Sequence, residues 1–598
     1  MLTQHRYSFA FLIGIALLGG CSPGHGAPPA NGAGGDGGQE GVPDPAGAGA
    51  AGMAEMTDGQ GGAAAAAAGD GCFAATDCDD GLSCNGSEVC VAGECQSGIA
   101  TPCDPGMECS ERASGKCVFT DRSPWIVYEA DDDTPGVPEV YAVKRGLLGK
   151  MPPIKINAPL EAGWAAFRPG AWSPDGQMYA FPMIRREPYE VAIQVVHFGD
   201  GLPEPAVQLP GDGGQWSPSG KLLATAGPLD VAIYTRNEAG TVELAFREGD
   251  ANREQVYGSW GANDTFVFAA QRKSDKLWNI SRAYLDGVTW RTGLIVQDLD
   301  LQGFDLSPDL SELIYAALPL PQAEASLFAV SLNRITSPLE IARPGRNGIR
   351  WSSDGRSYLL SLGASVNDAT PREMQVFLGT GAVADLQVRQ VAHGTNLIGA
   401  GFTPDGEGFL TMREHPEWGE RLAVYDSATG VGRSVGDFIA RADEVRWSPD
   451  GGRLAMPNHT SETSDVELTL VGVAANRDTL RLDSIPPNLR YYNLQFSRGG
   501  EFFAYYKGDD ATRDYDAAYV DLRYHTVVDP KPVPLPGDGK MWTMNFDPDG
   551  SGLYYIKERS NGARDCFFLD LSQQVAKEPV QINRAGRVDH CYAQALSD

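Results

Sequence analysis

The chain is short of basic residues. Its 598 residues include 78 Asp and Glu but only 48 Lys and Arg, which gives a formal net charge of −30. Proteins bind nucleic acid largely by neutralising phosphates with Lys and Arg. A chain with this excess of acid offers no such basis, so nucleic acid is excluded as a partner. The acidity instead suits a soluble, exported module that resists aggregation.

Sequence motifs of several catalytic classes are also missing. Beyond residue 71 there is no P-loop, no G-x-G-x-x-G and no H-E-x-x-H, and G-x-S-x-G occurs once, at residues 432–436. A serine peptidase would further need a separate α/β domain, and the repeats described below leave no residues to build one. The sequence therefore predicts a protein that is not an enzyme and that carries no cofactor.

Long hydrophobic runs are absent except near the N-terminus, where residues 9–18 are apolar. This run is too short to span a membrane and predicts a secretory signal over residues 1–21. Its ending, Leu18-Gly19-Gly20-Cys21, resembles the bacterial lipobox. The resemblance implies cleavage before Cys21, lipidation of its sulfur and, with Ser22 next, anchoring to the outer membrane of a Gram-negative bacterium, on either face. An ordinary signal cleaved elsewhere is the alternative.

A Gly- and Ala-rich segment follows. Residues 22–71 contain 16 Gly and 14 Ala but no Lys or Arg. So little apolar side-chain surface cannot build a core, and the segment is expected to be a disordered tether with a reach of roughly 40 Å.

Cysteines are concentrated in the next 48 residues, 72–119. An even number at this density in an exported chain predicts a small disulfide-rich module whose pairing stays open. A zinc site is the alternative, but no C-x-x-C pair exists, and no metal is expected. The stretch Asp77–Gly86 resembles short Cys-rich modules of exported myxobacterial proteins. The eight cysteines are Cys72, Cys78, Cys84, Cys90, Cys95, Cys103, Cys109 and Cys117.

The rest of the chain repeats one short phrase nine times: an aromatic residue or Leu, a tight turn, then an apolar strand. Trp172-Ser-Pro-Asp-Gly176 and Trp447-Ser-Pro-Asp-Gly451 are clear copies. Trp260 lies at the expected position, but a different turn sequence follows it. Successive copies lie 44 to 51 residues apart, the spacing of a repeat architecture. Each repeat should contain four short antiparallel strands, the fourth preceding the next aromatic, as in residues 443–447. Such a unit is one blade of a β-propeller.

The phrase W-S-P-D-G with its following strands resembles the TolB-type, WD40-like (PD40-type) propeller repeat. The resemblance covers residues 120–598 and implies an all-β propeller fold, while leaving function open. Residues 121–130 look like a unit without its first strand, and residues 586–593 look like a lone first strand. Together they would complete one blade and close the ring, giving about ten blades in one ring, or split between two. Cys566 and Cys591 are expected to form a disulfide that holds the closure.

Basic residues recur where the chain leaves the second strand of several blades. Converging on one face, they could bind an anionic ligand or an acidic peptide; the alternative is that they only keep strand ends soluble. Three blades break the pattern, one with Asp131-Asp132-Asp133, which is either solvated acid or a calcium site. The candidate basic residues are Arg186, Arg272, Lys273, Arg413, Lys507, Lys557 and Arg559.

Two histidines, His415 and His459, lie 13 and 12 residues beyond the aromatic of their units. They are either a pair beside the central channel or two ordinary loop residues. Some TolB-like propellers are metal-assisted uronate lyases, which makes a lyase on acidic polysaccharide, with Arg413 and these histidines as first suspects, the alternative function. The favoured function is a lipid-anchored, non-enzymatic binding or scaffold protein of the cell envelope that recognises a protein or glycan.

Overall fold

The computed structural model describes residues 72–593 apart from 73, 80–83, 85–86, 99–102, 104–106, 111–115, 168, 228, 238–239, 310, 319–325, 333–336, 343–348, 353–354, 356, 364–372, 381–386, 396, 416–418, 430, 435–444, 459–463, 473–478, 510–511, 513, 524–530, 537–538, 574–577 and 585–586. The predicted signal, Cys21 and the tether therefore lie outside the described residues. The chain divides into two compact units, residues 1–101 and 102–598.

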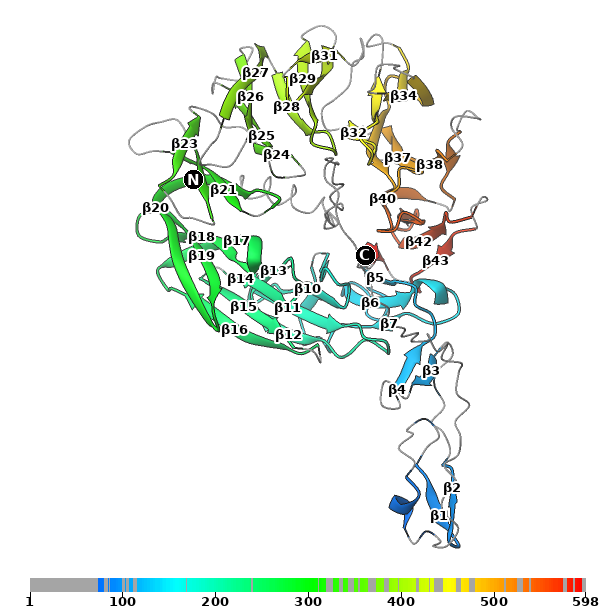
Figure 1. The fold of residues 1–598 in the computed structure, drawn as a ribbon. Coiled ribbons are helices and arrows are strands. Elements are labelled where there is room, and N and C mark those ends of the chain that lie inside the picture. The colour runs from blue at the N-terminus through cyan, green and yellow to red at the C-terminus, as the bar shows by residue number, and fades with distance from the viewer. Residues whose placement is uncertain are drawn as a thin grey trace, which may run out of the picture. The chain divides into compact units, whose positions relative to one another are not determined.

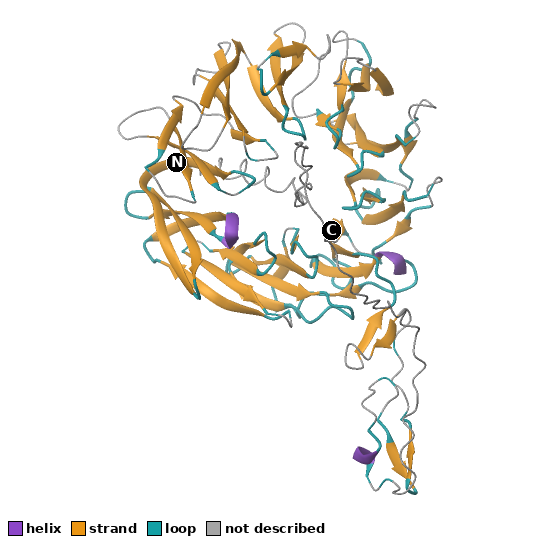
Figure 2. Ribbon diagram, viewed as in Figure 1, coloured by secondary structure: helices purple, strands orange, loops and turns teal. Residues whose placement is uncertain are grey.

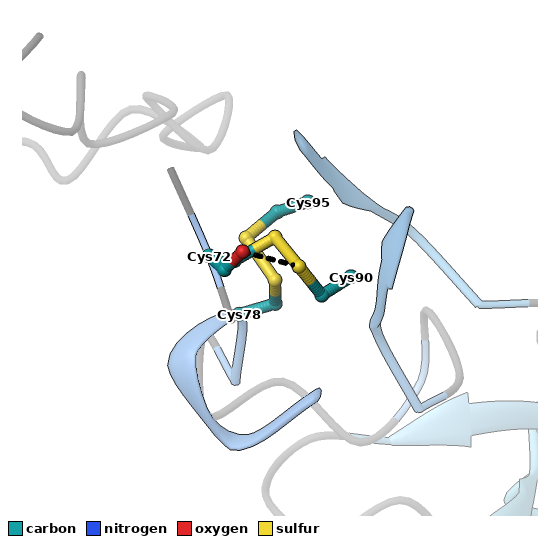
Figure 3. Close-up of a disulfide and its surroundings, with 4 residues drawn as sticks. All are labelled: Cys72, Cys78, Cys90 and Cys95. Carbon is teal, nitrogen blue, oxygen red and sulfur yellow. Dashed lines mark hydrogen bonds between the residues drawn. A yellow bond between two sulfur atoms is a disulfide. The ribbon is translucent and has the colours of Figure 1, made fainter. Parts of the chain in front are cut away.

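The first unit contains the 3-10 turn η1 (Ala75–Asp77) and a hairpin of β1 (Val89–Val91) and β2 (Glu94–Gln96). Two disulfides, Cys72–Cys90 and Cys78–Cys95, attach the segment around η1 to the hairpin (Figure 3). The sulfur atoms of Cys72, Cys78 and Cys95 lie within 4.8 Å of one another because the two bridges are neighbours. All ten cysteines from Cys72 onward are disulfide-bonded, as the cysteine pattern predicts.

The second unit begins with a hairpin of β3 (Met107–Ser110) and β4 (Lys116–Phe119), in which Cys103 is bonded to Cys117. Strands then dominate (Figure 2) and form ten antiparallel blades, as predicted. Blade 1, the closing blade, has the order β44 (Val588–Ala593), β5 (Trp125–Ala130), β6 (Glu139–Lys144) and β7 (Ile154–Lys155), with η3 (Arg145–Leu147) after β6.

The other blades follow in chain order (Figure 1). Blades 2 to 4 comprise β8 (Trp164–Ala166), β9 (Ala171–Trp172), β10 (Met178–Arg185), β11 (Glu190–His197) and β12 (Val207–Pro210); β13 (Asp212–Trp216), β14 (Leu222–Ala226), β15 (Asp230–Arg236) and β16 (Val242–Gly249); and β17 (Arg253–Trp260), η4 (Ala262–Asp264), β18 (Phe266–Arg272), β19 (Trp278–Asp286) and the first part of β20 (Thr289–Leu306). Blades 5 to 7 comprise the rest of β20 with β21 (Glu312–Leu318), β22 (Ser326–Ser331) and β23 (Leu339–Ala342); β24 (Ile349–Trp351), β25 (Ser357–Gly363), β26 (Glu373–Thr380) and β27 (Gln387–Thr395); and β28 (Leu397–Phe402), β29 (Gly408–His415), β30 (Gly419–Asp426) and β31 (Gly432–Ser434). Blades 8 to 10 comprise β32 (Arg446–Trp447), β33 (Arg453–Asn458), β34 (Val466–Gly472) and β35 (Thr479–Ile485); β36 (Arg490–Phe496), β37 (Phe502–Asp509), β38 (Asp514–Asp521) and β39 (Val533–Pro534); and β40 (Lys540–Phe546), β41 (Gly552–Glu558), β42 (Arg564–Asp570) and β43 (Val580–Gln581).

One strand assignment from the sequence is wrong. The strand that ends at the repeated aromatic, such as β32 at Trp447, pairs with the strand after the turn and opens its own blade. The fourth strand of the preceding blade lies earlier, at β31. The reason is the turn itself, because a tight turn joins two antiparallel neighbours and so places the aromatic and the following strand in one sheet.

The repeated turn is held by its own side chains. The Ser448 hydroxyl donates to Asp450 at 2.5 Å and accepts the N–H of Arg453 at 2.9 Å. Gly451 has a φ of +68°, and a Cβ there would lie 3.5 Å from Pro404 in the turn of the preceding blade. Gly220 meets Pro174 in the same way, at 3.4 Å. Consecutive turns therefore lie close together, and Gly supplies the left-handed backbone that the turn requires.

We expect Gly451→Ala to lower the free energy of unfolding by about 1–2 kcal/mol, because an L-residue is disfavoured at this positive φ. Chemical denaturation would measure it. Gly452→Ala is the matched control, since the neighbouring glycine has no positive φ and its replacement should change stability by no more than about 0.5 kcal/mol. Equal effects of the two substitutions would contradict this explanation of the motif.

Apolar clusters join each blade to the next. Tyr358 of β25 packs on Ile314 and Leu327 of blade 5, and Phe409 of β29 packs on Leu359 and Leu378 of blade 6. Similar clusters lie between every other consecutive pair, and the cluster around Ile126, Ile556 and Val588 joins blade 10 to blade 1. The blades therefore form one closed ring, which settles the alternative of two rings.

Three kinds of contact secure the closure. β44 pairs with β5, opposing Cys591 to Tyr128 and Ala593 to Ile126, as predicted from the chain ends. The disulfide Cys566–Cys591 links β42 of blade 10 to β44. On the side of the turns, Arg145 donates to Asp547, to Asp549 at 3.1 Å and to the Ser551 hydroxyl at 3.1 Å. Arg236 makes the corresponding contact from blade 3 to Asp175 of blade 2, at 2.6 Å.

Candidate functional site

A cavity of about 1260 Å³ lies at the closing blade, which we call the closing-blade cavity. The second strand of each blade, such as β5 or β10, starts at the repeated turn. The last residues of these strands therefore lie on the opposite face of the ring, and residues there, Glu129 and Ile184, line the cavity. Its walls come from blades 1, 2 and 10. They include Glu129, Glu139, Lys155, Trp164, Ile184, Arg186, Trp542, Arg564, Asp589 and His590.

Glu129 is a buried carboxyl group in the wall of this cavity. It is the one charged residue of β5, where its Cα neighbours are Val140 on β6 and His590 on β44. The residue is 7% exposed, and among the described residues it has neither a hydrogen-bond donor nor an ion-pair partner. Burial raises the pKa of Glu129 to about 7, and the nearby Asp589 contributes in the same direction.

A register shift between Val588 and His590 leaves Asp589 opposite no residue of β5. Such a bulge re-aims a side chain next to the pairing strand. Asp589 accepts from Arg564 at 2.6 Å and lies 3.3 Å from the Nε atom of Arg587. Burial lowers the pKa of the neighbouring His590, and the positive charge of Arg564 lowers it as well.

Arg564, at the start of β42, organises the wall from blade 10. It is 4% exposed, donates to Glu558 at 2.6 Å in addition to Asp589, and its guanidinium carbon lies 3.4 Å from the ring centre of Trp542. A buried guanidinium with two carboxylates and an aromatic face is fully engaged. It holds Trp542, which is 46% exposed, as an aromatic surface at the cavity.

The remaining wall is charge-compensated. Lys155 pairs with Glu139 and lies 3.5 Å from Asp133. On blade 2, Arg185 pairs with Glu190, lies 3.8 Å from Glu161 and stacks 5.3 Å from the ring centre of Trp164. Glu129 is thus the buried carboxyl of the cavity that no described cation neutralises.

Arg186 is the one predicted basic residue that the structure places in this cavity. It is exposed in the loop after β10 and has no hydrogen-bond or ion-pair partner within the described part of the chain.

The other described basic candidates each contact an acidic side chain or a backbone carbonyl. Arg272 contacts Asp275 at 2.8 Å and Asp298 at 2.7 Å; Lys507 contacts Asp483 at 3.0 Å; Arg559 contacts Asp565 at 2.5 Å; Lys273 donates to the Ala251 carbonyl at 2.8 Å; and Lys557 donates to the Leu535 carbonyl at 2.9 Å. Arg413 and His415 belong to β29, but their side chains, like the whole of His459, lie outside the described residues.

The triple acid at residues 131–133 joins the two ends of the ring. Asp131 accepts from the backbone N–H groups of Gly136, at 2.8 Å, and Arg587. Asp132 accepts from the Tyr128 hydroxyl at 3.0 Å and the N–H of Arg584 at 3.3 Å. These carboxylates therefore order the connection into β44.

Sequence reasoning missed Glu129, Trp542, Arg564, Asp589 and His590. The available signal was a charged residue inside an otherwise apolar strand, as Glu129 is in Trp125–Ala130. The other four residues lie at positions that are not part of the repeated phrase.

No protein-family model matches the sequence, and a search of curated proteins found no match. The TolB-like assignment of the repeat therefore stays a prediction. Among solved structures, the chain is similar to a eukaryotic initiation factor (11% identity, TM-score 0.45, 79% of this chain and 99% of that one). It is also similar to an oligogalacturonate lyase in complex with manganese (14%, 0.33, 58% and 97%) and to dipeptidyl peptidase 4 of Porphyromonas gingivalis (11%, 0.40, 62% and 60%). These values are too low to say anything about function. Among the described residues, no helix has the length and apolar character needed to cross a membrane.

Proposed function

We propose that the propeller is a non-enzymatic binding module whose ligand occupies the closing-blade cavity. The supporting observation is the cavity itself, about 1260 Å³ across three blades, with a half-exposed Trp and a buried carboxyl group that has no partner among the residues the structure describes. Binding sites are typically concave, with a few placed polar groups among apolar ones. A closed ring holds such groups rigidly, which suits recognition without a conformational change.

The proposed setting is the bacterial cell envelope, with the chain anchored through Cys21 and the ligand a protein or glycan of that compartment. The disulfides support an oxidising compartment, because such bridges are rare in the cytosol. The lipobox-like ending at residues 18–21 supports the anchor.

We expect Ala162→Trp to abolish capture of the ligand from envelope fractions by the purified chain. Ala162 is exposed in the cavity wall, so an indole there would fill part of the space without disturbing the core. Ala251→Trp, at an exposed turn outside the cavity, is the matched control and should capture as wild type does. Quantitative mass spectrometry of the captured material measures the effect, and equal recovery with both variants would place binding elsewhere.

The alternative function, a lyase on acidic polysaccharide, draws support from one observation. A carboxyl group whose pKa is about 7, in a cavity that also contains a histidine, is suited to general acid–base chemistry. Incubation of the chain with a polyuronate, followed by ultraviolet absorbance of the unsaturated product, tests this. Turnover that disappears in Glu129→Gln, or in the earlier suspects Arg413→Ala, His415→Ala and His459→Ala, would replace the binding proposal.

A further inference from the structure

We infer that Glu129 recognises a primary ammonium group carried on an unbranched chain, as in the lysine side chain of a peptide ligand. This inference rests on the proposed function and specifies the chemistry of its ligand. It differs from the expectation of an anionic ligand, because the recognising group is an acid.

The first argument is the isolation of the Glu129 carboxyl. The residue is more than nine-tenths buried, lines the cavity and has no donor or cation within the described part of the chain. A buried carboxylate without a partner is unfavourable, and a cation that arrives with a ligand relieves that cost. A ligand ammonium would thus be favoured at this position over any neutral group.

The second argument is that two other acids of the cavity wall are already paired, while the remaining two, Glu161 and Glu187, are exposed to water. Glu139 is paired with Lys155, and Asp589 with Arg564 and Arg587. An incoming cation gains little from these pairs, since their charges cancel. It gains most at Glu129, which makes the position of the cation specific.

The third argument is the shape of the space beside Glu129. A recess of about 10 Å³ shares Glu129 and His590 with the large cavity, and its other walls include Val127, Val140 and Phe181. That volume admits about one water-sized group. An ammonium group has this size, and the methylene groups that precede it in lysine would extend from the recess into the large cavity. An amino sugar carries its nitrogen directly on the ring, without a methylene chain, and so serves as the comparison ligand.

The test is calorimetric titration of the full chain with a blocked Gly-Lys-Gly peptide, the same peptide acetylated on the lysine nitrogen, and glucosamine. We expect the free lysine peptide to bind at least about tenfold more tightly than the other two, a factor worth about 1.4 kcal/mol. Glu129→Gln should remove this preference. Glu312→Gln is the matched control, because Glu312 is also 7% exposed but lies in β21, outside the cavity.

Retention of the lysine preference by Glu129→Gln would overturn the inference, and so would tighter binding of glucosamine than of the peptide. Thermal unfolding of each variant verifies that it is folded. If Ala162→Trp loses the envelope ligand while Glu129→Gln keeps it, the proposed function stands and the ammonium inference fails. If Ala162→Trp also keeps the ligand, the proposed function itself fails.

Discussion

Replacing Arg145 with Ala should lower the free energy of unfolding by about 3–5 kcal/mol, the cost of removing one partner from a buried ion pair. The Asp547 side chain is fully buried and contacts Arg145, which also lies 3.1 Å from Asp549. Burial and the adjacent Asp549 raise the pKa of Asp547 to about 7. Without the guanidinium, two neighbouring carboxyl groups would remain at the junction of blades 10 and 1.

The loss should grow with pH. A carboxyl group whose folded pKa lies above its unfolded value lowers stability as the pH rises between the two, because it ionises readily in the unfolded chain but stays protonated in the folded protein. Loss of the guanidinium should raise the folded pKa of Asp547 further and extend this range to higher pH. The Arg145→Ala variant should therefore lose more stability at pH 8 than at pH 5. Chemical denaturation at both values measures this, and an effect independent of pH would contradict the role given to Asp547.

Arg236→Ala provides the control at the corresponding contact between blades 3 and 2. Its partner Asp175 has a side chain 39% exposed, so water can replace the lost guanidinium. Its replacement should cost only about 1 kcal/mol. A loss as large as that from Arg145→Ala would show that the position in the blade, rather than burial of the acid, sets the energy.

Removing the Cys566–Cys591 disulfide should lower the free energy of unfolding by about 3–4 kcal/mol. The bridge closes a loop with a sequence separation of 25, and cross-linking a loop of this length restricts the unfolded chain. The double variant Cys566→Ser with Cys591→Ser should also let β44 detach first. Hydrogen exchange should then accelerate most in β44 and in β5, the strand that β44 covers.

The double variant Cys103→Ser with Cys117→Ser is the comparison, because it opens a bridge in the β3–β4 hairpin, outside the ten blades. It should leave exchange in β5 and β44 unchanged. Uniform acceleration across all blades in the Cys566 and Cys591 variant would mean that the closure does not unfold separately.

The fold could be predicted from the sequence because its determinants are local and repeated. Each Ser-Pro-Asp-Gly turn fixes the pairing of its two flanking strands, and nine copies at even spacing leave one architecture. The ends of the chain also predict the closure. The unit that begins with Trp125–Ala130 lacks a first strand, and Val588–Ala593 is a first strand without a unit of its own.

The cavity could not be predicted in the same way. Glu129, Trp542, Arg564 and Asp589 are brought together by ring closure from positions more than 400 residues apart, and the repeat assigns none of them a role. The basic candidates show the opposite case, positions that the repeat marks and the cavity does not include. Arg272 and Arg559 recur at a repeated position, but each meets an acid of its own blade, because an acidic chain supplies a nearby carboxylate for most cations.

β20 limits where the polypeptide can be cut and rejoined. One strand of 18 residues serves as the last strand of blade 4, through Thr289–Leu299, and as the first strand of blade 5, through Asp300–Leu306. New termini created by circular permutation would be tolerated in loops between other blades, but a break within β20 would interrupt a continuous strand that pairs in two blades. Blades 4 and 5 are therefore joined by a continuous strand, without the loop that separates other consecutive blades.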